Sequence, residues 1–167
     1  MSSQQPYKVL CVCLGNICRS PTAEAVLRHF CQQHQLNVHV DSAGTAAYHI
    51  GEAPDSRSQQ HARQRGYDLS VLRARQLSLN DFLDFDLILA MDEQNLKNIQ
   101  KIEYQAQQQF VQLRAQVYMM TEHAAELQRQ AIADPYYGGA EGFERVLDQC
   151  ETASQAWVNV FKSSQKQ

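Results

Sequence analysis

The sequence predicts an α/β fold in which a parallel sheet lies between two layers of helices. Short apolar segments alternate with amphipathic helical segments along the chain, which is the pattern of repeated β-α-β units. Aliphatic residues dominate segments 8–12 (KVLCV) and 86–90 (DLILA), as expected of strands that are covered on both faces. The sheet is therefore expected to be central, with helices on each side.

The first predicted unit is the strand at residues 8–12 followed by a helix at residues 20–34. Pro21 suits the first turn of that helix, and apolar residues then recur every three or four positions. These are Ala23, Val26, Leu27, Phe30 and Cys31. A second strand is predicted at residues 37–40.

The remaining elements continue the alternation. Further strands are predicted at residues 86–90 and 116–118, and further helices at 55–65, 78–83, 92–101 and 141–161. One apolar stripe follows the last helix, so Cys150 and Trp157 on it are expected in the core, as is Cys31 on the first helix. The glutamine-rich residues 105–116 are expected to form a polar surface insertion between a helix and a strand.

Length and composition favour a single domain that spans residues 1–167. A chain of 167 residues with 44% hydrophobic content can bury roughly 70% of its unfolded surface. The first six residues lack a basic region followed by an apolar stretch, so we expect neither a secretion signal nor an anchor. No segment reaches the length needed to span a membrane.

Charge and cysteine content narrow the class further. The net charge of −3 and the absence of a long basic face argue against a nucleic-acid partner. Five cysteines, an odd number with three near one loop, do not resemble the disulfide framework of a secreted protein. We therefore expect a cytoplasmic location, where thiols stay reduced.

The run CLGNICRS at residues 13–20 places a thiol six residues before an arginine, between the first strand and the first helix. Gly15 allows a tight bend, and Asn16 tolerates the left-handed conformation that such loops need. Inward-facing N–H groups and the helix dipole behind them favour an anion. Arg19 adds a planar fork for two phosphate oxygens, so the loop predicts a phosphate site with Cys13 at its base.

A cysteine in this setting predicts two-step covalent catalysis. Thiols at helix N-termini beside an arginine ionise readily, and the thiolate serves as nucleophile and then as leaving group. One alternative is that Cys13 is a buried structural thiol, the usual state of a free cysteine. Another is a metal site built from Cys11, Cys13 and Cys18, but the paired spacing and a fourth ligand are missing.

The stretch CLGNICRSPTAE resembles the phosphate-binding loop of the low-molecular-weight protein tyrosine phosphatases. Further matches follow in the family's order over nearly the whole chain: DSAGT at 41–45, ARQL at 74–77, FDLILAMDEQN at 85–95 and DPYYG at 134–138. The resemblance implies a flavodoxin-like three-layer fold with a central four-stranded parallel sheet flanked by helices on both faces. It also implies hydrolysis of phosphotyrosine through a phosphocysteine on Cys13, without a metal or other cofactor.

The DPYY motif implies the general acid. In the family this motif carries the acid and an aromatic wall on one loop, so Asp134 is the expected acid, and later the base, with Tyr136 and Tyr137 beside it. A positioned acid typically contributes about 10²- to 10⁴-fold to the rate. Tyr48 is expected to form the opposite wall of a slot that suits a tyrosyl ring. An isolated Asp-Pro pair would instead indicate a simple turn.

The resemblance implies supporting groups around the thiol. The expected substrate-binding residues of the loop are Leu14, Gly15, Asn16, Ile17, Cys18 and Ser20. Ser42 is expected to help Asn16 brace the loop, and Asp92 to serve as a supporting residue and helix cap. Many relatives carry a bracing histidine near the position of Leu72, so we expect a rearranged brace here.

Cys18 is the expected redox partner of Cys13. By resemblance, a disulfide between these two residues would block attack while preventing irreversible oxidation. The alternative is that Cys18 only packs at the start of the helix.

The expected partner is a phosphotyrosine-containing protein, with a tyrosine kinase of exopolysaccharide assembly or a host protein as examples if the source is bacterial. We expect a monomer with weak self-association. Arsenate reductases share the fold and loop, but they need resolving cysteines between Cys31 and Cys150, where this chain has none. A silent phosphotyrosine-binding module should lack Cys13, Arg19 or Asp134, and all three are present.

Overall fold

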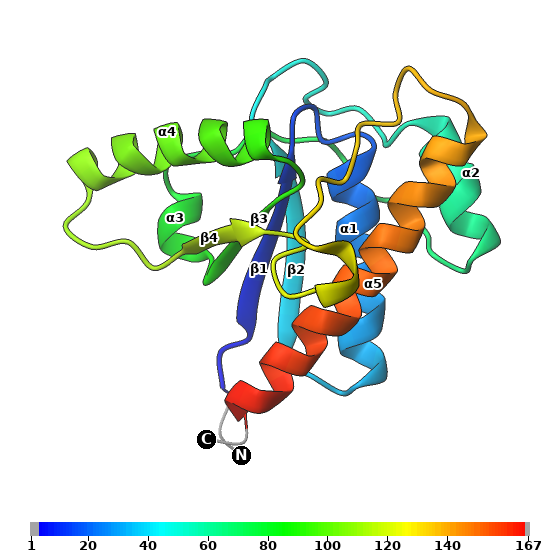
Figure 1. The fold of residues 1–167 in the computed structure, drawn as a ribbon. Coiled ribbons are helices and arrows are strands. Elements are labelled where there is room, and N and C mark those ends of the chain that lie inside the picture. Colours follow the sequence, from blue (N-terminus) through cyan, green and yellow to red (C-terminus); the bar gives the residue numbers. More distant parts are fainter. Residues whose placement is uncertain (1–3, 166–167) are drawn as a thin grey trace.

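The computed structural model describes residues 4–165 and is shown in Figure 1. Within those residues, four strands alternate with five α-helices. The strands are β1 (Tyr7–Cys13), β2 (Val38–Gly44), β3 (Leu87–Ala90) and β4 (Gln116–Met119). The helices are α1 (Arg19–Gln33), α2 (Ser56–Gln64), α3 (Asp81–Asp84), α4 (Glu93–Gln109) and α5 (Ala140–Gln165), with a 3-10 turn η1 (Ala125–Leu127).

The four strands form one parallel sheet in the order β2-β1-β3-β4. The predicted four-stranded parallel sheet is therefore confirmed. The order reverses between β1 and β3, and open α/β sheets bind their ligands outside the carboxyl ends of the strands at such a point. β1 ends there at Cys13.

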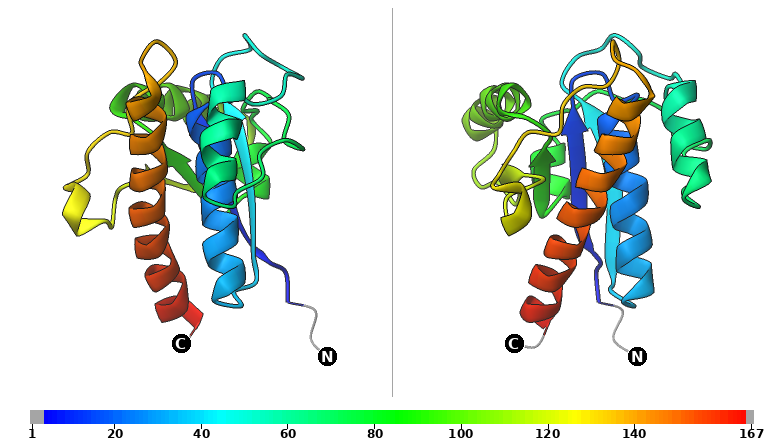
Figure 2. Two further views of the ribbon diagram at one scale, coloured as in Figure 1. Left: turned by 90° about the vertical axis from the view of Figure 1, so that its right-hand side faces the viewer. Right: turned by 45° about the vertical axis from the view of Figure 1, so that its right-hand side comes forward.

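The two faces of the sheet carry separate cores, because successive residues of a strand point to opposite sides. Val9 and Cys11 of β1 lie in the cluster that includes α1 and α5. Leu10 and Val12 lie in the cluster that includes α3 and α4. The sheet is thus the middle of three layers, as the ribbon views show (Figures 1 and 2).

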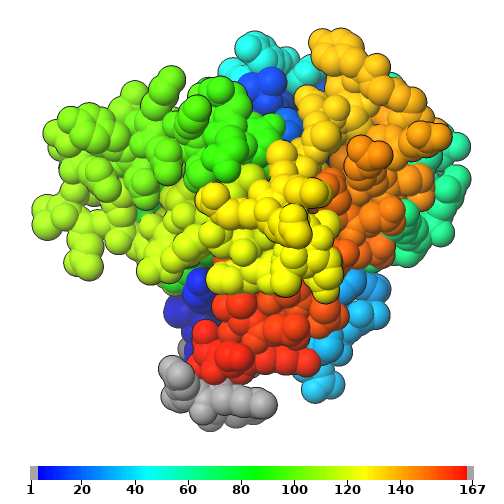
Figure 3. All heavy atoms as spheres, in the orientation of Figure 1, coloured from blue at the N-terminus to red at the C-terminus, as the bar shows by residue number. Residues whose placement is uncertain are grey.

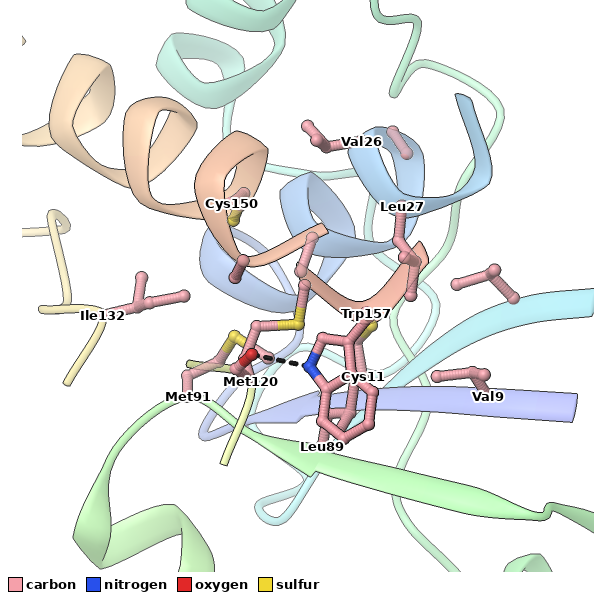
Figure 4. Close-up of a cluster of buried hydrophobic side chains, with 14 of the residues drawn as sticks. Val9, Cys11, Val26, Leu27, Leu89, Met91, Met120, Ile132, Cys150 and Trp157 are labelled. Atoms are coloured by element: carbon pink, nitrogen blue, oxygen red, sulfur yellow. Dashed lines mark hydrogen bonds between the residues drawn. The ribbon is translucent and has the colours of Figure 1, made fainter. Parts of the chain in front are cut away.

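Figure 4 shows the core between the sheet and α5. Trp157 is 3% exposed, and its indole N–H donates to the carbonyl of Met120 at 2.7 Å. Cys150 and Cys31 are also buried. The prediction that these three residues belong to the core is confirmed.

The predicted end of α4, residue 101, is too early. The helix continues past residue 101 to Gln109, so residues 105–109 of the expected insertion are helical and only residues 110–115 connect it to β4. Ile99, Ile102, Ala106 and Phe110 keep the helical spacing and pack in the α4 core, which stabilises the extra turns. β2 likewise continues through the DSAG stretch to Gly44, and α5 extends to Gln165.

The loops after β1 and β2 and the loop before α5 gather at one end of the molecule, where β1 ends and α1 begins (Figure 2). In Figure 3 the segment after β4, coloured yellow to orange, covers the surface between α4 and α5. None of the helices within residues 4–165 is long and apolar enough to cross a membrane.

Candidate active site

The phosphate loop (residues 13–19) connects the end of β1 to the start of α1. Asn16 has a φ of 59°, so the left-handed conformation predicted for this residue is confirmed. The backbone of the loop is held from outside, since Thr45 and Ala46 donate their N–H groups to the carbonyls of Cys13 and Leu14 at 2.9 Å. The loop is therefore fixed to the end of β2 as well as to β1.

Cys13 lines a cavity of about 290 Å³. Its side chain is 3% exposed. The N–H of Asn16 donates to Sγ at 3.3 Å, and the Ser20 hydroxyl lies 3.1 Å from Sγ. The N–H of Asn16 is thus aimed at the sulfur, and the Ser20 hydroxyl is the second polar group in contact with it.

Arg19 is buried beside the thiol and held by two acceptors. Its Nη1 donates to Oδ2 of Asp92 at 2.6 Å and to the carbonyl of Ile132 at 3.0 Å. Oδ1 of Asp92 accepts the N–H of Asn95 at 2.6 Å, so Asp92 caps α4 and orients the arginine at once. Nη2 of Arg19 lies 3.7 Å from Oδ2 of Asp134, which is beyond hydrogen-bond distance.

The side chain of Asn16 braces the loop through three hydrogen bonds. Nδ2 donates to the hydroxyls of Ser20 at 2.7 Å and Ser42 at 2.9 Å, while Oδ1 accepts the N–H of Arg75 at 3.0 Å. The Ser20 hydroxyl accepts from Asn16, and its own proton has two acceptors within reach, the carbonyl of Ala43 at 3.3 Å and Sγ of Cys13 at 3.1 Å. The amide thus links β2, the phosphate loop and the segment before α3.

The brace continues to a buried carboxylate. The Ser42 hydroxyl donates to Oε1 of Glu24 at 2.6 Å, and Arg28 is paired with Oε2 of Glu24 and with the carbonyl of Val40. Burial raises the pKa of Glu24, against the effect of its hydrogen bonds. Leu72, near the position where many relatives carry a histidine, packs against the apolar core instead.

The Asp134 loop (residues 133–139) lines the same cavity through Asp134, Tyr136 and Tyr137. Oδ1 of Asp134 accepts the N–H of Tyr136 at 3.0 Å, and its side chain is 43% exposed. The rings of Tyr136 and Tyr137 meet edge to face with centroids 4.9 Å apart. Tyr48, 73% exposed, lines the cavity from the loop after β2.

Cys18 lines the same cavity but is 5% exposed. It packs with Ile17, Ala74 and Phe143, and burial raises its pKa to about 12. The structure thus brings Cys18 into the site as a packed, un-ionised thiol. The remaining loop residues Leu14, Gly15 and Ile17 line the cavity directly.

Sequence reasoning missed Glu24, Arg28 and the carbonyl of Ile132. It also missed His49, which lines the cavity and pairs with Glu52 at 2.6 Å. One signal was present: Glu24 follows Ala23 on the apolar face of α1, where a carboxylate needs a partner. The carbonyl of Ile132 lies 113 residues from Arg19 and gives no local signal.

The arrangement defines a class of protein, one that holds a phosphate ester against a thiol. A family model described as "Low molecular weight phosphotyrosine protein phosphatase" matches residues 8–167. The protein of that name from Schizosaccharomyces pombe is 43% identical over 139 residues, which cover 81% of this chain and 85% of the relative.

Two solved structures are also similar. A protein tyrosine phosphatase from Entamoeba histolytica superposes with a TM-score of 0.85 at 36% identity, covering 95% of this chain and 99% of the other. A Drosophila arginine phosphatase gives 0.84 at 33% identity, covering 93% and 98%.

The chain belongs to the low molecular weight phosphotyrosine protein phosphatase family. It is a cysteine-based hydrolase that acts on phosphoproteins.

Proposed function

We propose that Cys13, Arg19 and Asp134 carry out the hydrolysis of phosphotyrosine in this phosphatase. The observation that carries the proposal is that one cavity is lined by Cys13, Arg19 and Asp134 together. The contacts of Asn16 and Ser20 with Sγ favour the thiolate.

In the first step the Cys13 thiolate attacks phosphorus, and the bond from phosphorus to the tyrosyl oxygen breaks. Asp134 gives its proton to that oxygen, so tyrosine leaves as a neutral phenol. The loop amides and the guanidinium of Arg19 stabilise the charge on the phosphoryl oxygens. Asp92 holds Arg19 in place through the 2.6 Å hydrogen bond.

In the second step a water molecule attacks the phosphocysteine. The Asp134 carboxylate takes a proton from that water, and the bond from phosphorus to sulfur breaks. Inorganic phosphate forms and the Cys13 thiolate returns. The Ser20 hydroxyl, 3.1 Å from Sγ, stabilises the departing thiolate.

The walls of the cavity support an aromatic phosphate ester as substrate. Tyr48, Tyr136, Tyr137, Leu14 and Ile17 surround the approach to Cys13 with ring and aliphatic surface. A phosphotyrosyl side chain is long enough to reach the thiol between these walls, whereas phosphoserine is too short. Phosphoarginine is the second candidate, since one similar structure is that of an arginine phosphatase.

The class of protein substrate is inferred from the chemistry of the site. We propose a phosphotyrosine-containing protein, for which an autophosphorylated tyrosine kinase is one example. Five unpaired, buried cysteines support a reducing, cytoplasmic setting. We further propose that residues 1–167 act as one domain, and as a monomer with weak self-association.

The test is steady-state hydrolysis of an aryl phosphate in the presence of a chelator, with Cys13→Ser and Asp134→Ala as variants. We expect no activity in Cys13→Ser and a loss of about 10²-fold or more in Asp134→Ala. Phosphotyrosine, phosphoserine and phosphoarginine peptides are then compared. An active Cys13→Ser variant would contradict the assignment of the nucleophile, and a preference for phosphoarginine would contradict the proposed substrate.

A further inference from the structure

Arg57, the second residue of α2, lies between the phosphate loop and the Asp134 loop. No catalytic step described above uses it. Its guanidinium is close to the ring of Tyr136, 5.5 Å from the centroid, and to that of Phe143, at 4.8 Å. It therefore touches both the Asp134 loop and the start of α5.

On the side of the Asp134 loop, Nη2 of Arg57 donates to the carbonyl of Tyr136 at 3.0 Å. The N–H of the same tyrosine donates to Oδ1 of Asp134 at 3.0 Å. Within residues 4–165, Arg57 is the only side chain outside the Asp134 loop that hydrogen-bonds to its backbone. Arg57 and the Asp134 carboxylate thus bind the same residue, Tyr136, one through its carbonyl and the other through its N–H.

On the side of the phosphate loop, Arg57 forms a two-point ion pair with Asp55. Nε lies 3.1 Å from Oδ1, and Nη2 lies 3.0 Å from Oδ2. The N–H of Asp55 donates to the carbonyl of Ile17 at 2.8 Å. Phe143 packs in the same apolar cluster as Ile17 and Cys18. Asp55 and Phe143, which both contact Arg57, are therefore each in contact with the phosphate loop.

We propose that Arg57 is a positioning residue that sets the place of Asp134 relative to Cys13. It fixes the Asp134 loop to the phosphate loop through the chain of contacts from Ile17 to Asp55, Arg57 and Tyr136. The inference rests on the proposed role of Asp134 as general acid. Arg57 itself acts through the loop and not on the substrate.

The role predicts a dependence on the leaving group. An acidic phenol leaves without help, whereas a weakly acidic phenol such as tyrosine needs the proton from Asp134. A displaced acid should therefore slow poor leaving groups selectively. A purely structural loss would lower all rates alike.

The experiment measures kcat/KM for a series of aryl phosphates whose phenols differ in acidity. Arg57→Met removes the donor and the charge but keeps an unbranched apolar stem. We expect a loss of about 10-fold for the least acidic phenols, a fraction of the 10²- to 10⁴-fold total of general acid catalysis, and about twofold or less for the most acidic. Arg57→Lys should recover part of the loss, because an ammonium group can still donate to the carbonyl of Tyr136.

Arg65→Met is the matched control. Arg65 also connects this region to α5, through ion pairs with Glu144 at 2.8 Å, Asp148 at 2.9 Å and Glu151 at 2.6 Å. It makes no hydrogen bond with the Asp134 loop in the described residues. We expect this variant to keep the wild-type dependence on the leaving group.

Asp134→Asn separates the inference from the function on which it rests. If Asp134→Asn steepens the dependence and Arg57→Met does not, the inference about Arg57 is wrong while the acid is right. If Asp134→Asn leaves the dependence unchanged, the assignment of the acid itself is wrong. A uniform loss in Arg57→Met, or the same loss in Arg65→Met, would also overturn the positioning role.

Discussion

Substitution of Asn16 tests the conformation and the bracing of the phosphate loop together. Asn16→Gly removes three hydrogen bonds, of which those to Ser20 and Ser42 are buried and that with the N–H of Arg75 is partly buried. At about 1 kcal/mol each, their loss should lower the free energy of unfolding by about 3 kcal/mol. Asn16→Ala loses the same bonds but, unlike glycine, keeps a β-carbon at a φ of 59°. The left-handed backbone costs about 1–2 kcal/mol for a residue with a β-carbon. Part of this difference is offset because glycine loses more conformational freedom on folding than alanine does.

We therefore expect alanine at position 16 to be less stable than glycine by about 1 kcal/mol, the reverse of their order in a helix. Urea unfolding followed by the fluorescence of Trp157 gives both free energies on one scale. An alanine variant as stable as the glycine variant would refute the left-handed conformation. Losses below about 1 kcal/mol in both variants would refute the energetic contribution of the brace.

Three other predictions follow from single contacts. Asp92→Asn removes the charged acceptor of Arg19, and hydrogen bonds to charged groups contribute about 1.5–3 kcal/mol. The value of kcat/KM for an aryl phosphate should therefore fall by about 10- to 100-fold. An unchanged value would limit Asp92 to capping α4. After peroxide treatment, the wild-type enzyme should form a Cys13–Cys18 disulfide and regain activity with added thiol, whereas Cys18→Ser should not. Because the pKa of Cys18 is raised to about 12, formation of the disulfide should become faster as the pH rises. Equal recovery of activity in the two proteins would contradict the pairing. Hydrogen bonds from Arg65 and His61 hold the pKa of Glu144 below its ordinary 4.5. The contribution of Glu144 to the stability of the fold is therefore present above pH 4.5 and is lost as the pH falls through the lowered pKa. Glu144→Gln should therefore reduce stability by at most about 1 kcal/mol at neutral pH and by nothing in acid; a loss that persists in acid would contradict the charge effect.

The central strands and the phosphate loop could be predicted from the sequence because their signals are local. The apolar runs mark β1 and β3, and Gly15 and Asn16 mark the bend between β1 and α1. The extent of α4 was harder to predict, because glutamines at residues 105–109 hide a helical spacing that Ile102, Ala106 and Phe110 complete in the core. Helix ends depend on such tertiary packing more than on propensity.

The parts of the site that local patterns do not reveal are long-range contacts. Asp92 and Arg19 are 73 residues apart, and Arg57 and Tyr136 are 79 residues apart. Each pair meets only in the folded chain, Asp92 and Arg19 just beyond the ends of β3 and β1, and Arg57 and Tyr136 where α2 lies beside the loop before α5. The family resemblance named Asp134 and the tyrosines, but no spacing in the chain shows that an arginine on α2 anchors their loop.

The central claim is that Cys13 carries the phosphoryl group between two chemical steps. The direct test mixes the enzyme with a rapidly cleaved aryl phosphate, quenches in acid within one turnover, and maps the modified peptide by mass spectrometry. The account predicts one phosphoryl group on the peptide that contains Cys13, at higher occupancy in Asp134→Asn, where water is not activated. Turnover without any phosphoryl group on Cys13, or its appearance on another residue, would contradict the account.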